Sequence, residues 1–235
     1  MTTMQLALIG NGRMGQAIAL AAGERGHQVR TVVEGRENHD GMAITRERMA
    51  GVDVALEFTR PDQAPLNLLR LARLGIPAVS GTTGWSDRFA EVTREVATCG
   101  SALLHSPNFS IGAQLFLQAA ADLAQRFADR AEFDGYLLDQ HHALKRDVPS
   151  GTALRLRAVV KGVDPGRPFP ISSVRAGSTP GSHTVAYDSP HELIRLEHVA
   201  RGRQAFADGA LRAAEWVRGR NGVFTFEEML FGGER

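Results

Sequence analysis

Cysteine is almost absent from this chain of 235 residues: Cys99 stands alone, so no disulfide can form within the chain, and we expect it to be a small buried side chain. Net charge is also almost absent, because 27 Lys and Arg against 26 Asp and Glu leave +1. No global basic field therefore points to nucleic acid. No apolar run approaches the roughly 20 residues that cross a bilayer, and no signal-peptide pattern opens the chain. We expect a cytoplasmic protein with a local site and no nucleic-acid or membrane partner.

The first half of the chain alternates short apolar runs with segments of helical periodicity. The runs predict strands over 6–9, 29–33, 52–58, 76–80 and 102–105, and the periodic segments predict helices over 13–25, 62–74 and 87–98. In the last of these helices we expect Phe89, Val92 and Val96 to point inward. Strands separated by helices predict a parallel sheet that is covered on both faces.

The pattern changes after Pro107. A helix over 111–127 precedes a strand near 133–139, a helix after Ser150, and short extended runs at 171–175, 183–187 and 192–197, which indicate a mixed or antiparallel sheet. The helix over 204–218 and the tail are expected to return to the first domain. The fold class is thus α/β, with a Rossmann-type parallel-sheet domain (1–108 and 205–235) and a smaller α+β domain (109–204).

A glycine pattern follows the first predicted strand. Gly10, Gly12 and Gly15 form G-x-G-x-x-G, which allows a tight turn, close approach of a pyrophosphate, and close packing of the helix. Glu34 ends the second strand, where a carboxylate accepts hydrogen bonds from ribose and disfavours a 2′-phosphate. Arg36 is either a partner for such a phosphate or a solvated cation, so the cofactor is NADH or NADPH, with NADH slightly favoured. The expected site includes the other loop residues, Asn11, Arg13 and Met14.

Residues 139–153 read DQHHALKRDVPSGTA and place a histidine pair and a lysine between a strand and a helix. An imidazole donates a proton near neutral pH, Lys145 supplies a fixed cation, and a helix N-terminus holds an anion. We therefore expect a small carboxylate substrate and no metal. The spacing alone also allows two other interpretations, in which the histidines are surface residues or chance metal ligands. Asp147 either orients Lys145 or an imidazole, or caps the turn, and we favour the turn. Arg175 and His183 either face this site or form ion pairs on a sheet surface. The expected site residues are His141, His142, Lys145, Ser150, Gly151 and Thr152.

Motifs along nearly the whole chain resemble the 4-hydroxy-tetrahydrodipicolinate (dihydrodipicolinate) reductase family of lysine and diaminopimelate biosynthesis. They are GRMG (12–15), EFTRP (57–61), GTTGW (81–85), PNFSIG (107–112), HHxxKxDxPSGTA (141–153), SVRAG (173–177), GSHTV (181–185) and FADGALRAAEW (206–216). The histidine segment is too long and too ordered to match by chance.

The resemblance implies a reductase that transfers a hydride from NADH or NADPH to a cyclic dicarboxylate imine. It implies that His141 is the general acid, that Lys145 binds substrate and assists proton donation, that His142 contacts substrate, and that the Gly151 and Thr152 amides hold a carboxylate. It also implies that the domain over 109–204 binds substrate and builds a homotetramer through its sheet. Further cofactor contacts are implied for Gly81, Thr82, Thr83, Ser106, Pro107, Asn108 and Phe109.

Two departures from the family pattern motivate an alternative. The glycine loop is one residue shorter than in many members, and the segment between Thr152 and Ser173 is also short. The alternative is a related NAD(P)-dependent reductase of another small cyclic imine or keto acid.

Overall fold

The computed structural model describes residues 2–232, which form two compact units. One unit comprises the described residues up to Ser110 and from Arg203 onward, and the other is Ile111–Gly202. The expected junctions lie two residues from these. Among the described residues, no helix is long and apolar enough to cross a membrane.

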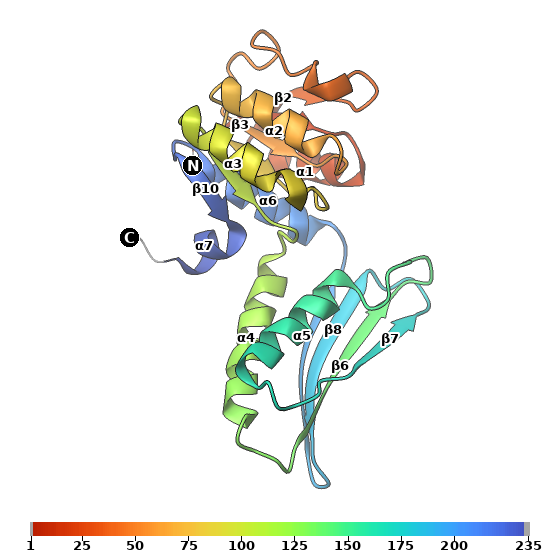
Figure 1. The fold of residues 1–235 in the computed structure, drawn as a ribbon. Coiled ribbons are helices and arrows are strands. Elements are labelled where there is room, and N and C mark those ends of the chain that lie inside the picture. Colours follow the sequence, from red (N-terminus) through yellow and green to blue (C-terminus); the bar gives the residue numbers. More distant parts are fainter. Residues whose placement is uncertain (1, 233–235) are drawn as a thin grey trace. The chain divides into compact units, whose positions relative to one another are not determined.

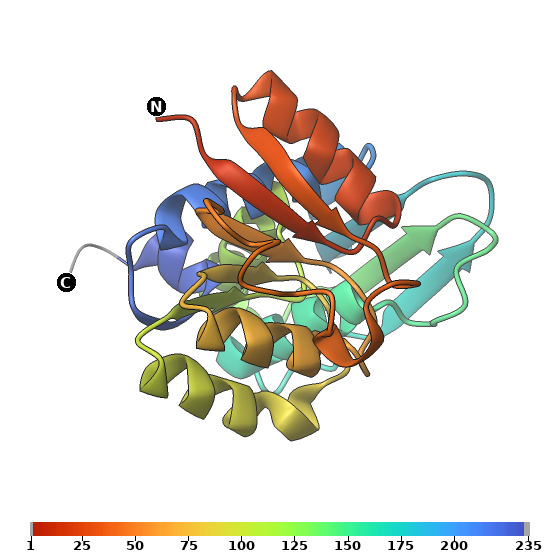
Figure 2. The same cartoon turned by 90° about the horizontal axis from the view of Figure 1, so that it is seen from above.

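The first unit is built on a six-stranded sheet in the order β10-β5-β4-β3-β1-β2, and every neighbouring pair is parallel. Helices α1 and α6 pack together on one face, and α2 and α3 pack on the other (Figures 1 and 2). This confirms the predicted doubly covered parallel sheet. The strands are β1 (Gln5–Ile9), β2 (Gln28–Val33), β3 (Val54–Glu57), β4 (Ala78–Ser80), β5 (Ala102–His105) and β10 (Gly222–Thr225). The helices are α1 (Arg13–Glu24), α2 (Ala64–Arg73), α3 (Phe89–Thr98), α6 (Gln204–Val217) and α7 (Phe226–Phe231), with 3-10 turns η1 (His39–Gly41) and η2 (Ser86–Arg88).

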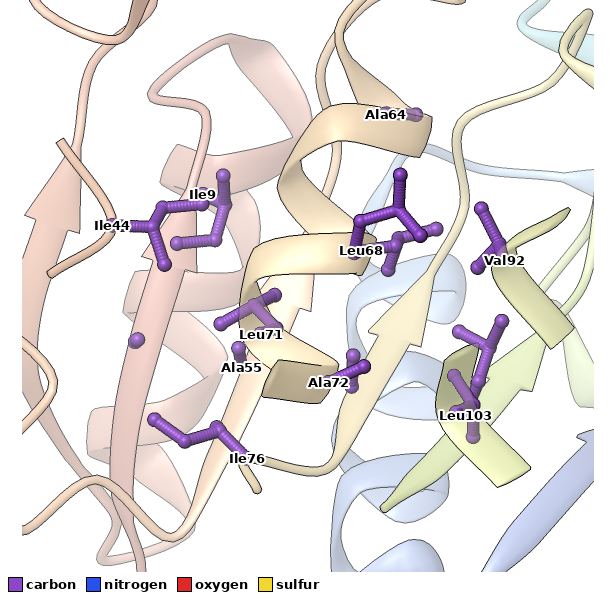
Figure 3. Packing of buried hydrophobic residues seen from close by; sticks show 14 of the residues in the cluster. Ile9, Ile44, Ala55, Ala64, Leu68, Leu71, Ala72, Ile76, Val92 and Leu103 are labelled. Carbon is purple, nitrogen blue, oxygen red and sulfur yellow. The ribbon is translucent and has the colours of Figure 1, made fainter. Parts of the chain in front are cut away.

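The apolar spacing of α2 explains the core between the sheet and its covering helices. Leu68, Leu71 and Ala72 are buried against side chains of the strands, including Ala55 and Leu103 (Figure 3). Each leucine buried in this way stabilises the fold by roughly 1.5–3 kcal/mol relative to an exposed one. The core fixes the carboxyl ends of the strands, from which the loops of the expected dinucleotide site emerge.

Two inward placements expected from the sequence are wrong. Phe89 is 36% exposed, because α3 begins at this residue and its ring lies beside the rings of Trp85 and His105. Cys99 is exposed at the end of α3, where the helix stops before its side chain can turn inward.

The chain returns to the first unit as expected, but it does so with two elements that the sequence analysis did not separate, β10 and α7. Helix α7 begins with a capping box, in which Thr225 accepts from the Glu228 amide and the Glu228 carboxylate accepts from the Thr225 amide. The Thr-x-x-Glu spacing was therefore a usable signal for this helix.

The second unit is a mixed four-stranded sheet in the order β7-β6-β8-β9, which confirms the predicted change of fold. Strands β6 and β7 are parallel, whereas β8 is antiparallel to both β6 and β9. Two helices cover the face that carries Leu137, Val185 and Tyr187. Because side chains alternate along a strand, Asp139, His141 and His183 point to that same face. The elements are α4 (Ile111–Phe127), β6 (Asp134–His141), α5 (Gly151–Val163), β7 (Ile171–Arg175), β8 (Gly181–Asp188) and β9 (Leu193–Ala200).

Candidate functional site

The glycine loop of the first unit has the geometry that each glycine was expected to permit. Gly10 has a φ of 102°, and a Cβ there would lie 2.3 Å from the Phe58 carbonyl oxygen. A Cβ on Gly15 would lie 2.2 Å from the Gly10 carbonyl oxygen, so only glycine lets α1 pack this close. Gly12 is the N-cap of α1, and a Cβ there would meet nothing within 4 Å. The loop therefore leaves open space in front of the first amides of α1, which suits a pyrophosphate.

A cavity of about 570 Å³ opens beside this loop and the end of β2. Glu34 accepts a hydrogen bond from Asn11 Nδ2 at 3.1 Å and pairs with Arg36 Nε at 2.7 Å. The Arg36 side chain is 84% exposed, so the pair can separate at little cost. The cavity is lined by Gly10, Asn11, Gly12, Val33, Gly35, Arg36, Asn38, His39, Phe58, Thr59, Arg60 and Gln63.

A second cavity of about 280 Å³ lies over the loops that follow β3, β4 and β5. Arg13 and Thr83 are exposed outside both cavities, and Ser106 is buried, with its hydroxyl donating to the Asn108 carbonyl oxygen at 2.9 Å. The lining includes the expected cofactor residues Met14, Gly81, Thr82, Pro107, Asn108 and Phe109, and also Phe58, Thr59 and Phe206.

Phe58 and Thr59 line both cavities and were not among the expected contacts, although the EFTRP motif contains them. Beneath them lies Glu57, which is fully buried and accepts hydrogen bonds from the hydroxyls of Thr59 and Ser80. Burial raises the pKa of Glu57. Thr82 Oγ1 accepts from the Thr59 amide at 2.8 Å, so one buried polar cluster supports the floor of both cavities.

In the second unit the predicted catalytic segment surrounds a carboxylate that the sequence analysis did not select. Asp139 is fully buried on β6 and accepts hydrogen bonds from Arg175 Nη2 at 2.7 Å and Ser173 Oγ at 3.0 Å. The amide and the hydroxyl of Ser150 also donate to it, at 2.9 and 2.8 Å. Although burial raises the pKa of Asp139, these hydrogen bonds hold it well below its usual range. No periodicity in the sequence predicts this cluster, because strand register brings its members together.

His141 ends β6 with its Nδ1 atom 3.0 Å from Asp139 Oδ1, at an angle that makes no regular hydrogen bond. His183 lies on the other side, with Nε2 at 3.5 Å from the same oxygen and 3.1 Å from Ser150 Oγ. Arg175 and His183 therefore face the site rather than an outer sheet surface. Burial lowers the pKa of His183 to about 4, so this imidazole is neutral at pH 7.

The loop after β6 carries the predicted cation. Lys145 is partly exposed, and its Nζ atom lies 2.8 Å from Asp147 Oδ1, so the favoured interpretation of Asp147 as only a turn cap is wrong. The His142 amide donates to the Thr179 carbonyl at 2.8 Å, which fixes this half-buried residue to the segment before β8. Burial lowers the pKa of His141; the Asp139 carboxylate opposes this, whereas the Lys145 and Arg175 cations add to it.

Ser150 is the N-cap of α5, as predicted, and its Oγ accepts from the Ala153 amide at 3.2 Å. A Cβ on Gly151 would meet nothing within 4 Å, and Thr152 is half-buried. The first amides of a helix have no partner within it, so this turn can hold a carboxylate. The site thus combines an imidazole, an ammonium and a helix N-terminus within one short segment.

The spacing of the Asp139, His141 and His183 ligand atoms, all within 4.8 Å of one another, would by itself suit a metal ion. However, the Asp139 carboxylate is already neutralised by the guanidinium of Arg175, and Lys145 adds a second cation nearby. A divalent ion there would be repelled by both cations. The cluster is better explained as a hydrogen-bonded anchor than as a metal centre.

Comparison with known proteins bears on the whole chain. The pattern described as the dihydrodipicolinate reductase N-terminus matches residues 4–109, and that of its C-terminus matches residues 112–230. The chain belongs to the dihydrodipicolinate reductase family. This confirms the resemblance that the sequence motifs carry.

Two relatives and one solved structure match most or all of their own length to this chain. A 4-hydroxy-tetrahydrodipicolinate reductase of Christiangramia forsetii is 34% identical over 240 residues, which cover 97% of this chain and 98% of that protein. One of Methanosarcina barkeri is 35% identical over 195 residues, which cover 76% of this chain and 73% of that protein. A dipicolinate-bound dihydrodipicolinate reductase from Paenisporosarcina sp. TG-14 shares the fold, with a TM-score of 0.78 at 22% identity over 98% of this chain and 100% of that one.

Proposed function

We propose that this chain reduces 4-hydroxy-tetrahydrodipicolinate to tetrahydrodipicolinate, with loss of water and oxidation of one reduced nicotinamide dinucleotide. The observation that carries the proposal is the segment at 141–152, where an imidazole, an ammonium and a capped helix N-terminus follow one another in a chain of the reductase family. A cyclic dicarboxylate needs cations and oriented amides, and this segment offers both.

Residues of this segment take the following roles in the proposed reaction. The bound dinucleotide supplies the hydride from its nicotinamide ring. His141 donates a proton to the ring carbon next to the hydride acceptor, and Lys145 offsets negative charge on the substrate and assists the donation. The amides of Gly151 and Thr152, with Ser150 and His142, hold a carboxylate.

The first unit is the proposed dinucleotide domain. The open space in front of Gly12 fits a pyrophosphate, and Glu34 at the end of β2 fits the ribose hydroxyls. The loops after β4 and β5 would hold the nicotinamide half. The second unit is then the substrate domain, and hydride transfer requires substrate bound there to reach the nicotinamide.

We further propose NADH as the preferred cofactor, with NADPH also accepted. The Glu34 carboxylate disfavours a 2′-phosphate, which supports NADH. Arg36, His39 and Arg60 line the same cavity, and an Arg36 released from Glu34 would pair with that phosphate. Measuring kcat/KM for both nucleotides tests this choice.

A homotetramer built through the second unit remains a proposal with a structural basis. Val174 and Val199 lie at the ends of one row across the sheet, through Gln140 and Ser182, on the face opposite the buried Leu137. Both valines are nearly half exposed. Exposed valines at both ends of a row on an open sheet face suit contact with a partner sheet, and light scattering gives the subunit number. We also place the protein in the cytoplasm, where the exposed thiol of Cys99 stays reduced.

The deciding assay supplies the purified chain with freshly made 4-hydroxy-tetrahydrodipicolinate and follows the oxidation of NADH or NADPH. Turnover with the dipicolinate-type substrate, and slower turnover with other cyclic imino acids, supports the proposal. Faster turnover with another imino or keto acid favours the alternative, and no turnover from folded protein overturns both.

A further inference from the structure

We propose that Asp139 is a positioning residue, whose buried carboxylate holds the His141 imidazole and the first turn of α5 in one arrangement. It does not touch the substrate; it acts through the residues that do. The inference rests on the proposed function only in assuming that His141 and residues 150–152 meet the substrate.

The two oxygens of the carboxylate have different neighbours. Oδ2 accepts from the guanidinium of Arg175, the hydroxyl of Ser173 and the amide of Ser150. Oδ1 accepts from the Ser150 hydroxyl and lies 3.0 Å from His141 Nδ1. The donors on Oδ2 come from β7 and from the start of α5, so they fix the carboxylate plane and turn Oδ1 toward the imidazole.

The imidazole of His141 is confined on both sides. Asp139 Oδ1 lies 3.0 Å from its Nδ1 atom, without the angle of a regular hydrogen bond, and on the other side a Cβ added to Gly181 would lie 2.9 Å from its Nε2 atom. The ring of His183 stands edge-on to it, with centroids 5.2 Å apart. A negative charge beside Nδ1 favours a proton on that atom, which leaves Nε2 as the atom that exchanges a proton with substrate.

The same carboxylate sets the cap of α5. The single hydroxyl hydrogen of Ser150 points to Asp139, so its oxygen is oriented to accept from the Ala153 amide. Because the Ser150 amide is also bonded to Asp139, the chain enters the helix at one fixed angle. The amides of the next two residues are thereby aimed by a group on the neighbouring strand.

The charges around His141 show how loss of Asp139 would change the pKa of this imidazole. Burial lowers the pKa of His141, and Lys145 from the following loop and Arg175 from β7 lower it further. Asp147 opposes them but is paired with Lys145. His183 from β8 is neutral at pH 7. Asp139 is therefore the main anion that keeps His141 able to hold a proton.

The test compares Asp139→Asn with Ser173→Ala, a matched control that removes one hydrogen bond to the carboxylate and keeps its charge. The pKa of His141 is measured by NMR titration of its imidazole, with the resonance identified by its loss in His141→Gln. In Asp139→Asn we expect this pKa to fall by about 1 to 3 pH units. The falling limb of the kcat/KM profile should move to lower pH by a similar amount, while Ser173→Ala leaves both nearly in place.

The outcomes separate a positioning role from a structural one. An activity loss that is equal at every pH, with an unchanged pKa of His141, overturns the proposal. If Asp139→Asn does not fold, Arg175→Met decides instead: removing this cation should raise the pKa of His141, and an unchanged value refutes the inference. If the wild-type chain shows no turnover, the reductase proposal fails, but the NMR titrations still decide the role of Asp139.

Discussion

Gly12→Ala should weaken dinucleotide binding without disturbing the fold. Gly12 has a φ of −76°, which alanine adopts freely, and the added Cβ would meet no atom within 4 Å. Since Gly12 is the N-cap of α1 and alanine caps a helix less well than glycine, we expect a loss of stability of about 0.5–1 kcal/mol. The methyl group would, however, occupy the space in front of the α1 amides. Losing one charge-assisted hydrogen bond to a phosphate costs about 1.5–3 kcal/mol, which raises the Kd for NADH roughly 10- to 150-fold.

The assay is a titration followed by the fluorescence of the bound reduced nicotinamide, beside a thermal melt by circular dichroism. Gly23→Ala is the matched control, because it lies in the exposed last turn of α1 and its Cβ would also meet nothing. It should stabilise the protein by about 0.4–1 kcal/mol and leave the Kd unchanged. Gly15→Ala should instead unfold the loop, since its Cβ would lie 2.2 Å from a backbone oxygen. A Gly12→Ala protein that is folded and binds NADH as tightly as the wild type refutes the proposed pyrophosphate position.

Two further predictions concern the first unit. Glu34→Gln removes the charge that opposes a 2′-phosphate and releases Arg36, so the ratio of kcat/KM for NADPH to that for NADH should rise about three- to tenfold; an unchanged ratio argues against this carboxylate as the selector. Glu57 has its pKa raised by burial, so its contribution to stability is present below its unfolded pKa of about 4.3 and is lost as pH rises through the folded value. Glu57→Gln should therefore flatten the decline of the melting temperature with rising pH, and a decline identical to the wild type contradicts this assignment.

The parts of the site that depend on local sequence could be predicted from it. The glycine loop places Gly10, Gly12 and Gly15 by their own backbone requirements, and the N-cap of α5 follows from Ser150 alone. Both signals lie within a few residues of the group they position. Hydrophobic periodicity is also a local signal, and it therefore predicted the order of the elements and the change of fold between the two units.

What could not be predicted depends on which strand residues pair. Asp139 lies opposite Ser173 on one side and His183 on the other, and only this register brings Arg175 to the carboxylate. A shift of one residue would turn all these side chains to the other face, and nothing in the local pattern specifies the register. Phe89 was misplaced because α3 begins at this residue and not two residues earlier, so its side chain lies at the exposed start of the helix. Cys99 was misplaced because its expected burial rested on its residue type alone, whereas it caps the exposed end of α3.

The central claim is that His141 donates the proton while the nucleotide is held elsewhere in the chain. The most direct test measures kcat and the Kd for NADH in His141→Gln and in the wild type. Loss of a general acid should lower kcat by about 10²- to 10⁴-fold, and the Kd should stay the same, because every proposed nucleotide contact lies in the first unit. A kcat close to the wild-type value, or equal losses in turnover and nucleotide affinity, would contradict the assignment.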